Sequence, residues 1–208
     1  MNKNMSIKAA NLLENIRTKA PFVWNFSNFV SMDIAANALL AIGASPAMAH
    51  AKEEANDFSQ ICKAISGALT INIGTFDPYW QECAKEAAKQ ANDNNVPWVL
   101  DPVGAGASQF RNKNVEDLMK LNPTVLRGNG SEIMAVSGIS GVGKGVDSTS
   151  SSNEALDAAN SIAIENKIIV AVTGEIDYVT DGKQTYAISG GHEMMTKVTA
   201  TGCALTCL

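Results

Sequence analysis

The chain has 208 residues, of which 46% are hydrophobic and 18% charged, and its formal net charge is -5. This length suits one compact domain, 1–208, and is short for two. The 16 lysines and arginines are spread along the chain, which excludes a basic stripe that follows nucleic acid or an anionic membrane. Polar residues interrupt Met1–Ala20, which therefore lacks the apolar run of a signal peptide or membrane span. We expect a cytoplasmic protein without a nucleic-acid or membrane partner.

An amphipathic helix at about Ser6–Arg17 opens the chain, and short apolar runs then alternate with helical segments. The expected strands are Phe22–Asn25, Pro46–Ala49, Ala68–Ile73, Trp98–Asp101, Thr124–Arg127 and Ile168–Thr173. The expected helices are Val30–Ile42, Glu53–Ile65, Pro78–Asn92, Asn114–Lys120, Ser131–Val136 and Asn153–Glu165. Short buried strands separated by helices predict an α/β fold with a mostly parallel sheet and helices on both faces.

Two segments depart from this alternation. Ile176–Ser189 contains two short strands around Asp181-Gly182, which predicts an antiparallel hairpin with a two-residue turn. Ser137–Ser152 is rich in Gly and Ser and is expected to be a long loop. Open α/β sheets bind ligands at the carboxyl ends of their strands, so we expect function in the loops there.

Two carboxylates stand where predicted strands end or helices begin. Asp101 ends the strand 98–101 before Pro102, and a magnesium or phosphate role and a plain Asx-type turn are equally good interpretations. Asn129 is followed three residues later by Glu132, which is typical of a helix-capping pair. A Glu at a helix start beside Asp101 also suits water-coordinated magnesium.

Two further strand ends and one helix start carry groups that bind anions. Arg127 is suited to hold a nucleotide phosphate, and Thr173 with Gly174 to contact phosphate oxygens. Small residues at Thr199–Ala204 open an apolar segment expected to be a helix, whose free amides would form an anion hole. Cys203 would lie there as a proton acceptor or as a small buried hydrophobe. We expect all four cysteines to be free thiols.

Together these segments resemble hydroxyethylthiazole kinases, of the ribokinase-like superfamily, along nearly the whole chain. The matching runs are Ala36–His50, Asn72–Thr75, Leu100–Ala107, Arg127–Ile133, Lys144–Ser148 and Val172–Val179. The resemblance implies a ribokinase-like three-layer α/β/α fold and ATP-dependent phosphorylation of the hydroxyl of hydroxyethylthiazole, in thiamine biosynthesis or salvage. It also implies Mg2+ as cofactor and a homotrimer with active sites between subunits.

The resemblance assigns site residues by position. They are Met48, Asn25, Ala200 and Gly202 for the substrate, Arg127 and Thr173 for ATP, and Asp101 and Glu132 for the metal. Cys203 stands where other ribokinase-like enzymes keep an aspartate base, so it or solvent is the implied catalytic proton acceptor. Loose phosphoryl-transfer transition states depend more on positioning than on a strong base.

Three features depart from the family pattern. Trp24 replaces the usual His, and Ala200 replaces the first glycine of a Thr-Gly-Thr-Gly-Cys run, so its methyl is expected to crowd the alcohol or the phosphate. The chain ends at Leu208, so the family's C-terminal helices are expected to be absent.

Two other functions stay open. One is another ribokinase-like enzyme, such as a hydroxymethylpyrimidine kinase or a nucleotide-dependent hydrate dehydratase, although an Asp would be expected there in place of Cys203. The other is a truncated, non-catalytic relic that binds the ligand without transferring phosphate.

Overall fold

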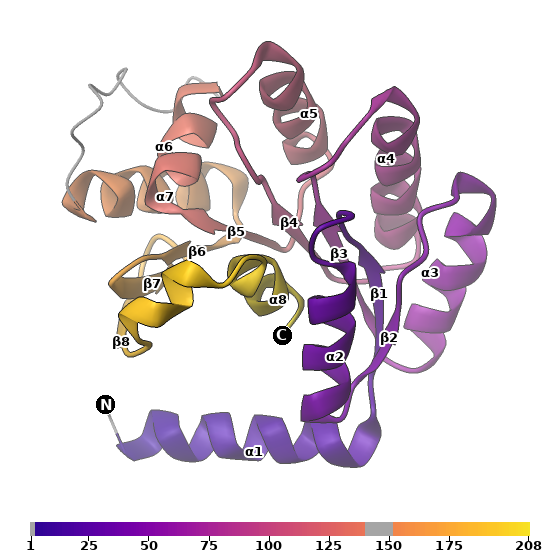
Figure 1. Ribbon diagram of the computed structural model, residues 1–208, viewed down its shortest axis with the longest axis horizontal. Coiled ribbons are helices and arrows are strands. Elements are labelled where there is room, and N and C mark those ends of the chain that lie inside the picture. Colours follow the sequence, from indigo (N-terminus) through magenta and orange to yellow (C-terminus); the bar gives the residue numbers. More distant parts are fainter. Residues whose placement is uncertain (1–2, 140–151) are drawn as a thin grey trace.

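The computed structural model describes residues 3–139 and 152–208, and one eight-stranded sheet runs through them (Figure 1). Its strands are β1 (Phe22–Phe26), β2 (Ser45–Ala47), β3 (Ala68–Asn72), β4 (Trp98–Asp101), β5 (Val125–Asn129), β6 (Ile169–Thr173), β7 (Ile176–Thr180) and β8 (Thr185–Ser189). The helices are α1 (Lys3–Lys19), α2 (Met32–Ile42), α3 (Ala55–Ala64), α4 (Pro78–Asp93), α5 (Gln109–Met119), α6 (Gly130–Ile139), α7 (Ser152–Asn166) and α8 (Thr201–Cys207). Two short 3-10 helices, η1 (Lys52–Glu54) and η2 (Glu193–Lys197), complete the set.

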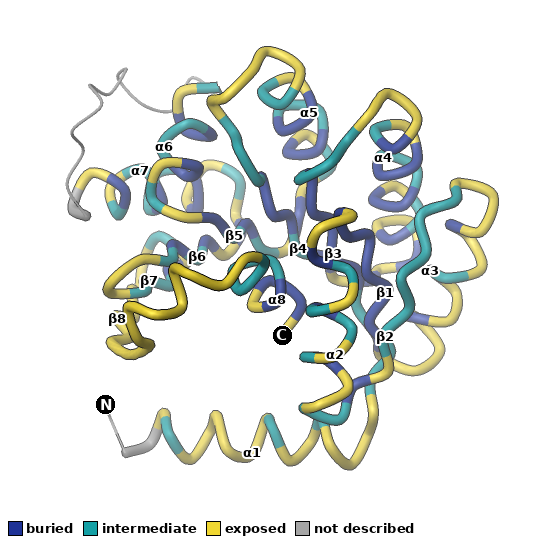
Figure 2. Tube along the Cα trace, viewed as in Figure 1, coloured by how far each residue is buried: buried dark blue, intermediate teal, exposed yellow. Residues whose placement is uncertain are grey.

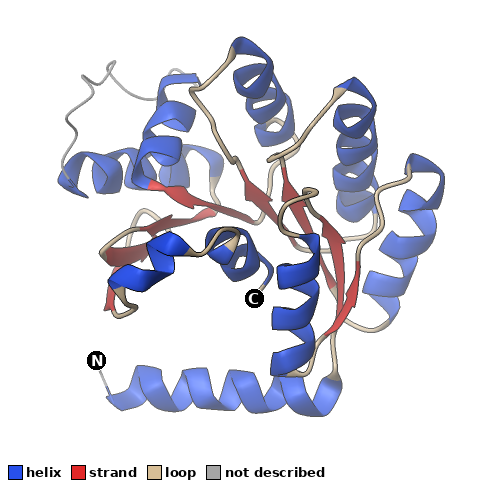
Figure 3. Cartoon of the chain, in the orientation of Figure 1, coloured by secondary structure: helices blue, strands red, loops and turns tan. Residues whose placement is uncertain are grey.

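The sheet has the order β2-β1-β3-β4-β5-β6-β7-β8. Neighbouring strands from β2 to β6 pair in parallel, whereas β6–β7 and β7–β8 are antiparallel. Figure 3 shows these strands between the helices. The predicted parallel sheet with an antiparallel hairpin is therefore confirmed. Six carboxyl ends meet at one edge of the sheet as a result.

Helices cover both faces of the sheet. Helices α3 to α7 pack successively side by side on one face, and α2 packs against α8 on the other (Figure 1). The central strands β1, β3 and β4 are largely buried, whereas β8 is exposed along its length (Figure 2). Trp24, Trp98, Ile71 and Leu100 are among the fully buried core side chains. This is the expected three-layer α/β/α arrangement.

Local sequence signals set several helix ends where they were predicted. Helix α4 begins at Pro78, and the carboxylate of Asp77 accepts a hydrogen bond from Trp80 N. Helix α2 ends at Gly43, whose left-handed φ of 95° lets its amide satisfy carbonyls of the last turn.

Helix α5 begins earlier than the sequence suggested. It starts at Gln109 rather than at Asn114, because the hydroxyl of Ser108 caps it by accepting from Arg111 N at 3.2 Å. The cap adds more than one turn to the helix, and it brings Arg111 inside α5.

The hairpin turn also differs from the prediction. Thr180 pairs with Thr185, so the connection is Asp181–Gln184 and not the two residues Asp181-Gly182. The Asp181 carboxylate accepts from the amides of Lys183 and Gln184, and this local bonding favours the longer connection.

The predicted loop Ser137–Ser152 is shorter at both ends. Residues Ser137–Ile139 continue α6, and Ser152 begins α7. The part at 140–151 lies outside the described residues. Across the two described ranges, no helix is both long and apolar enough to cross a bilayer.

Candidate active site

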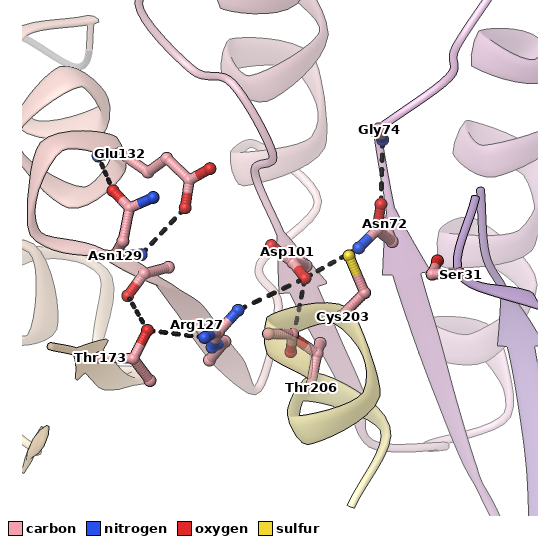
Figure 4. A network of polar contacts seen from close by, with 12 residues as sticks. Ser31, Asn72, Gly74, Asp101, Arg127, Asn129, Glu132, Thr173, Cys203 and Thr206 are labelled. Atoms are coloured by element: carbon pink, nitrogen blue, oxygen red, sulfur yellow. Dashed lines mark hydrogen bonds and ion pairs between the residues drawn. The ribbon is translucent and has the colours of Figure 1, made fainter. Parts of the chain in front are cut away.

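Polar side chains lie at or near the carboxyl ends of five neighbouring strands of the sheet. They are Asn25 on β1, Asn72 on β3, Asp101 on β4, Arg127 on β5 and Thr173 on β6. Helix α8 contacts β3 and β4, and its first turn lies opposite this row (Figure 4). Segments more than 170 residues apart in sequence therefore share one polar site.

Asp101 lies at the centre of the site and is fully buried. Its Oδ2 accepts hydrogen bonds from Asn72 Nδ2 at 2.8 Å and Thr206 Oγ1 at 2.7 Å, and lies 3.7 Å from Arg127 Nη1. Its Oδ1 is buried and has no hydrogen-bond partner among residues 3–139 and 152–208. Both donors are side chains, so within the described residues Asp101 forms no Asx-type turn. The free oxygen favours a ligand-binding role.

The surroundings of Asp101 raise the pKa of its carboxyl from 3.8 to about 6. Burial is the main cause, since it penalises the charged form. The charge of Arg127 and the hydrogen bonds from Thr206 and Asn72 act in the opposite direction, and the charge of Glu132 raises the pKa further. A bound cation would favour the ionised form.

This raised pKa predicts how stability depends on pH. The folded chain holds the Asp101 proton more tightly than the unfolded chain, so this contribution is complete below about pH 4 and is lost as pH rises through 6. Between pH 4.5 and 7.5 the free energy of unfolding should fall by about 2 kcal/mol relative to Asp101→Asn. Urea unfolding of both proteins at pH 4.5 to 7.5 tests this; parallel pH profiles would contradict it.

Glu132 is a capping residue, as one interpretation of the sequence held. Its Oε2 accepts from Asn129 N at 2.9 Å, and its own amide donates to Asn129 Oδ1 at 2.9 Å. The other oxygen, Oε1, accepts from Gly104 N at 2.9 Å. Glu132 thereby fastens the glycine-rich loop that follows Asp101 to the start of α6.

Arg127 connects the site from β5. Its Nη2 donates to Thr173 Oγ1 at 2.6 Å, whereas its buried Nε has no hydrogen-bond partner. A Cβ on Gly202 would lie 3.0 Å from Arg127 Nη1, so the glycine gives the guanidinium room beside α8. The structure therefore brings together Asp101, Arg127, Thr173 and Gly202.

Cys203 is half-buried in the first turn of α8. Asn28 Nδ2 donates to its Sγ at 3.6 Å and to Asn72 Oδ1 at 2.7 Å. The thiol therefore lies one residue away from the Asp101 network. As at every helix start, the first backbone N–H groups of α8 have no carbonyl acceptor within the helix.

Ala200 precedes α8 in a left-handed conformation with φ 65° and ψ 5°. A side chain costs about 1–2 kcal/mol there, whereas glycine adopts it freely. This conformation explains why a glycine suits the position.

Ala200→Gly should stabilise the chain by about 0.5–1 kcal/mol, because the relieved strain exceeds the entropy that a glycine adds to the unfolded chain. Urea unfolding measures it. Ala10→Gly in the exposed middle of α1 is the matched control and should destabilise the chain. Loss of stability in Ala200→Gly would contradict the strain at this position.

Asn25 and Met48, both predicted to bind substrate, lie beside the second turn of α8. Asn25 is 1% exposed; its Nδ2 donates to Cys207 Sγ at 3.1 Å, and its Oδ1 accepts from Thr70 Oγ1 at 2.8 Å. Met48 packs against the small apolar cluster that contains Cys207. Trp24 points to the other face of the sheet, where its Nε1 donates to Ala49 O.

The sequence interpretation missed several polar residues of the site. Asn72 could have been predicted, because it is a polar residue at the end of an apolar strand, as Asp101 is. Thr206 and Cys207 follow an apolar segment and carry no signal. Arg111 donates to Ile73 O, Gly74 O and Val103 O at 2.7–2.9 Å and so joins the loops after β3 and β4. The sequence did not indicate this role, because Arg111 was expected to lie before α5 rather than in its first turn.

The residues fit a magnesium ion that is held mainly by substrate. Mg2+ takes hard oxygen ligands and usually binds through one or two carboxylates, phosphates and water. Within the described residues, Asp101 Oδ1 is such a free oxygen, and each oxygen of Glu132 accepts one hydrogen bond. Among residues 3–139 and 152–208, no group of three His, Cys, Asp or Glu side chains forms a complete metal cage.

The α/β/α fold, with its polar site at the carboxyl edge of the sheet opposite a helix start, has the ribokinase-like architecture. The Staphylococcus aureus pyridoxal kinase in complex with ADP shares this fold, with a TM-score of 0.60 and 16% identity over 90% of this chain and 77% of that one. The sequence profile of the hydroxyethylthiazole kinase family matches residues 13–208. The chain belongs to the hydroxyethylthiazole kinase family.

Two close relatives agree with this membership. A hydroxyethylthiazole kinase of Rhizobium etli (strain CIAT 652) is 50% identical over 197 residues, which are 95% of this chain and 75% of the relative. The structure of a hydroxyethylthiazole kinase protein from Pyrococcus horikoshii OT3 has a TM-score of 0.86 and 41% identity, covering 95% of this chain and 73% of that one.

Proposed function

We propose that this chain phosphorylates the hydroxyl of hydroxyethylthiazole with ATP, as a step of thiamine biosynthesis or salvage. Family membership supports the reaction. The observation that carries the proposal is the convergence of a buried carboxylate with a free oxygen, an arginine and a threonine on the first turn of α8. These groups suit a phosphoryl group in transfer.

The proposed roles follow from the positions of the side chains. Arg127 binds an ATP phosphate through the guanidinium that Thr173 orients, and Gly202 lets that phosphate approach α8. Asn25, Met48 and Ala200 form the thiazole side of the site next to α8. Asp101 and Glu132 would hold Mg2+, which neutralises phosphate charge when bound.

In the proposed reaction, the alcohol oxygen bonds to the γ-phosphorus, the bond to the bridging oxygen of ADP breaks, and Cys203 or solvent takes the hydroxyl proton. The amides of Thr201–Cys203 stabilise charge on the transferring group. Because the transition state is loose, holding the alcohol in line accounts for most of the rate.

Cys203→Ala should therefore slow turnover by about ten- to a hundredfold and leave measurable activity. Steady-state ADP release with hydroxyethylthiazole measures this. Cys62→Ala, which removes a fully buried thiol beneath β3, is the control for general loss of a cysteine. Full activity in Cys203→Ala would remove the base role.

The remaining parts of the proposal concern the assembly and location of the protein. Residues 1–208 would act as a single kinase domain, in the cytoplasm where ATP is available. A homotrimer with active sites between subunits follows from family resemblance. The exposed apolar side chains of Phe29 and Val30, near the carboxyl end of β1, support a subunit contact beside the site.

The test is ADP release by the purified 208-residue chain with Mg-ATP, with and without hydroxyethylthiazole, together with its mass in solution. Thiazole-dependent turnover supports the proposal. A folded chain that binds the thiazole without turnover would instead favour a ligand-binding relic. Turnover with hydroxymethylpyrimidine in place of the thiazole would favour another ribokinase-like kinase.

A further inference from the structure

Thr206 lies in the second turn of α8 and contacts the buried carboxylate of the site. It is 5% exposed, and its Oγ1 lies 2.7 Å from Asp101 Oδ2, a residue 105 positions earlier. The same hydroxyl lies 3.2 Å from Gly202 O. Its single proton is directed to the shorter, charge-assisted contact with the carboxylate.

Two neighbours make the Asp101 carboxylate asymmetric. Thr206 and Asn72 both donate to Oδ2, whereas Oδ1 has no hydrogen-bond partner in the part of the chain that the structure describes (Figure 4). Asn72 is itself held, because its Oδ1 accepts from Asn28 Nδ2 at 2.7 Å and Gly74 N at 2.9 Å. Its amide nitrogen is therefore directed towards Asp101.

Arg127 would otherwise compete for both carboxylate oxygens. Its Nη1 is 3.7 Å from Oδ2, which is an ion pair without a close hydrogen bond. An arginine and a carboxylate pair best through two parallel hydrogen bonds, and the terminal torsion of Asp turns easily. A carboxylate that turned into such a pair would have no free oxygen and would draw Arg127 away from Thr173.

We propose that Thr206 is a positioning residue, which fixes the Asp101 carboxylate so that Oδ1 stays free for a ligand and Arg127 stays on Thr173. Helix α8 thereby contributes twice to the site. Its first turn faces the reacting groups, and its second turn orients the carboxylate opposite them. The catalytic part of this inference rests on the proposed kinase function.

The experiment compares Thr206→Val, which keeps the shape and removes the hydroxyl, with Thr206→Ser, which keeps the hydroxyl. Thr180→Val is the matched control, because Thr180 is 1% exposed and its hydroxyl donates to Asn160 Oδ1 at 2.7 Å, on the hairpin side of the sheet. Each protein is measured for kcat, for KM of hydroxyethylthiazole, and for binding of Mn2+ in the presence of ADP by electron paramagnetic resonance.

Thr206→Val should lower kcat and the affinity for Mn2+ with ADP by about tenfold each, with KM for the thiazole changed less than about twofold. Thr206→Ser should keep kcat and the affinity for Mn2+ near the wild-type values. Thr180→Val should lower the stability of the chain but leave kcat and the affinity for Mn2+ unchanged. Wild-type kcat and Mn2+ affinity in Thr206→Val would overturn the inference. An equal loss in Thr180→Val would overturn it too, because the effect would then be one of stability.

The two proposals fail separately. A wild-type chain without thiazole-dependent turnover contradicts the proposed kinase function. In that case the affinity for Mn2+ in the presence of ADP is the remaining test of the positioning role of Thr206. Weaker Mn2+ binding in Thr206→Val still supports the positioning role, and unchanged binding overturns it.

Discussion

Asp101→Asn is expected to lower kcat by at least about a hundredfold while the chain stays folded. The amide has the shape of the carboxylate, and its oxygen can still accept from Asn72 and Thr206. The substitution removes the negative charge of a buried carboxylate whose Oδ1 has no partner among the described residues. Steady-state kinetics with Mg-ATP and hydroxyethylthiazole provide the measurement.

The control for this variant is Asp93→Asn, which neutralises an exposed carboxylate at the end of α4. It should keep wild-type kinetics. Activity of Asp101→Asn within a fewfold of wild type would show that the buried carboxylate only supports the fold.

Arg127→Met is expected to lower kcat/KM for ATP by about a hundredfold, because it removes the cation at the proposed phosphate position. The loss should exceed that of a phosphate contact alone, since the buried Asp101 also loses its neighbouring charge. Arg127→Lys should recover only part of the activity. A lysine keeps the charge but cannot face Asp101 and donate to Thr173 through a planar fork.

Lys89→Met is the matched control, because Lys89 is an exposed cation on α4, which packs on the face of the sheet opposite α8. Initial rates at varied ATP separate KM from kcat for all three variants. Equal activity of Arg127→Lys and wild type would mean that the charge acts alone, without the fork geometry.

Much of the site could be predicted because local chemistry marks it. The apolar runs before Asp101, Arg127 and Thr173 identify buried strands, and parallel strands bring their carboxyl ends to one edge. The pair Asn129 and Glu132 is a capping signal within four residues, and the structure contains that pair. Short-range patterns of this kind need no knowledge of the tertiary fold.

The hairpin and α5 show where local patterns fall short. An Asp-Gly pair indicates a turn, but the Asp181 carboxylate and the pairing of Thr180 with Thr185 decide the register. In the same way, the single hydroxyl of Ser108 moves the start of α5 to Gln109. Such side-chain caps are weak individually and become decisive only in the folded surroundings.

The sequence by itself determined the fold class, the approximate positions of the strands and the family, because hydrophobic periodicity and contiguous motifs express these features within short segments. Only the tertiary structure decided how the site is held together. The contacts from Thr206 to Asp101 and from Asn25 to Cys207 join residues 105 and 182 positions apart. They depend on strand order and on where α8 packs, and neither property is encoded near those residues.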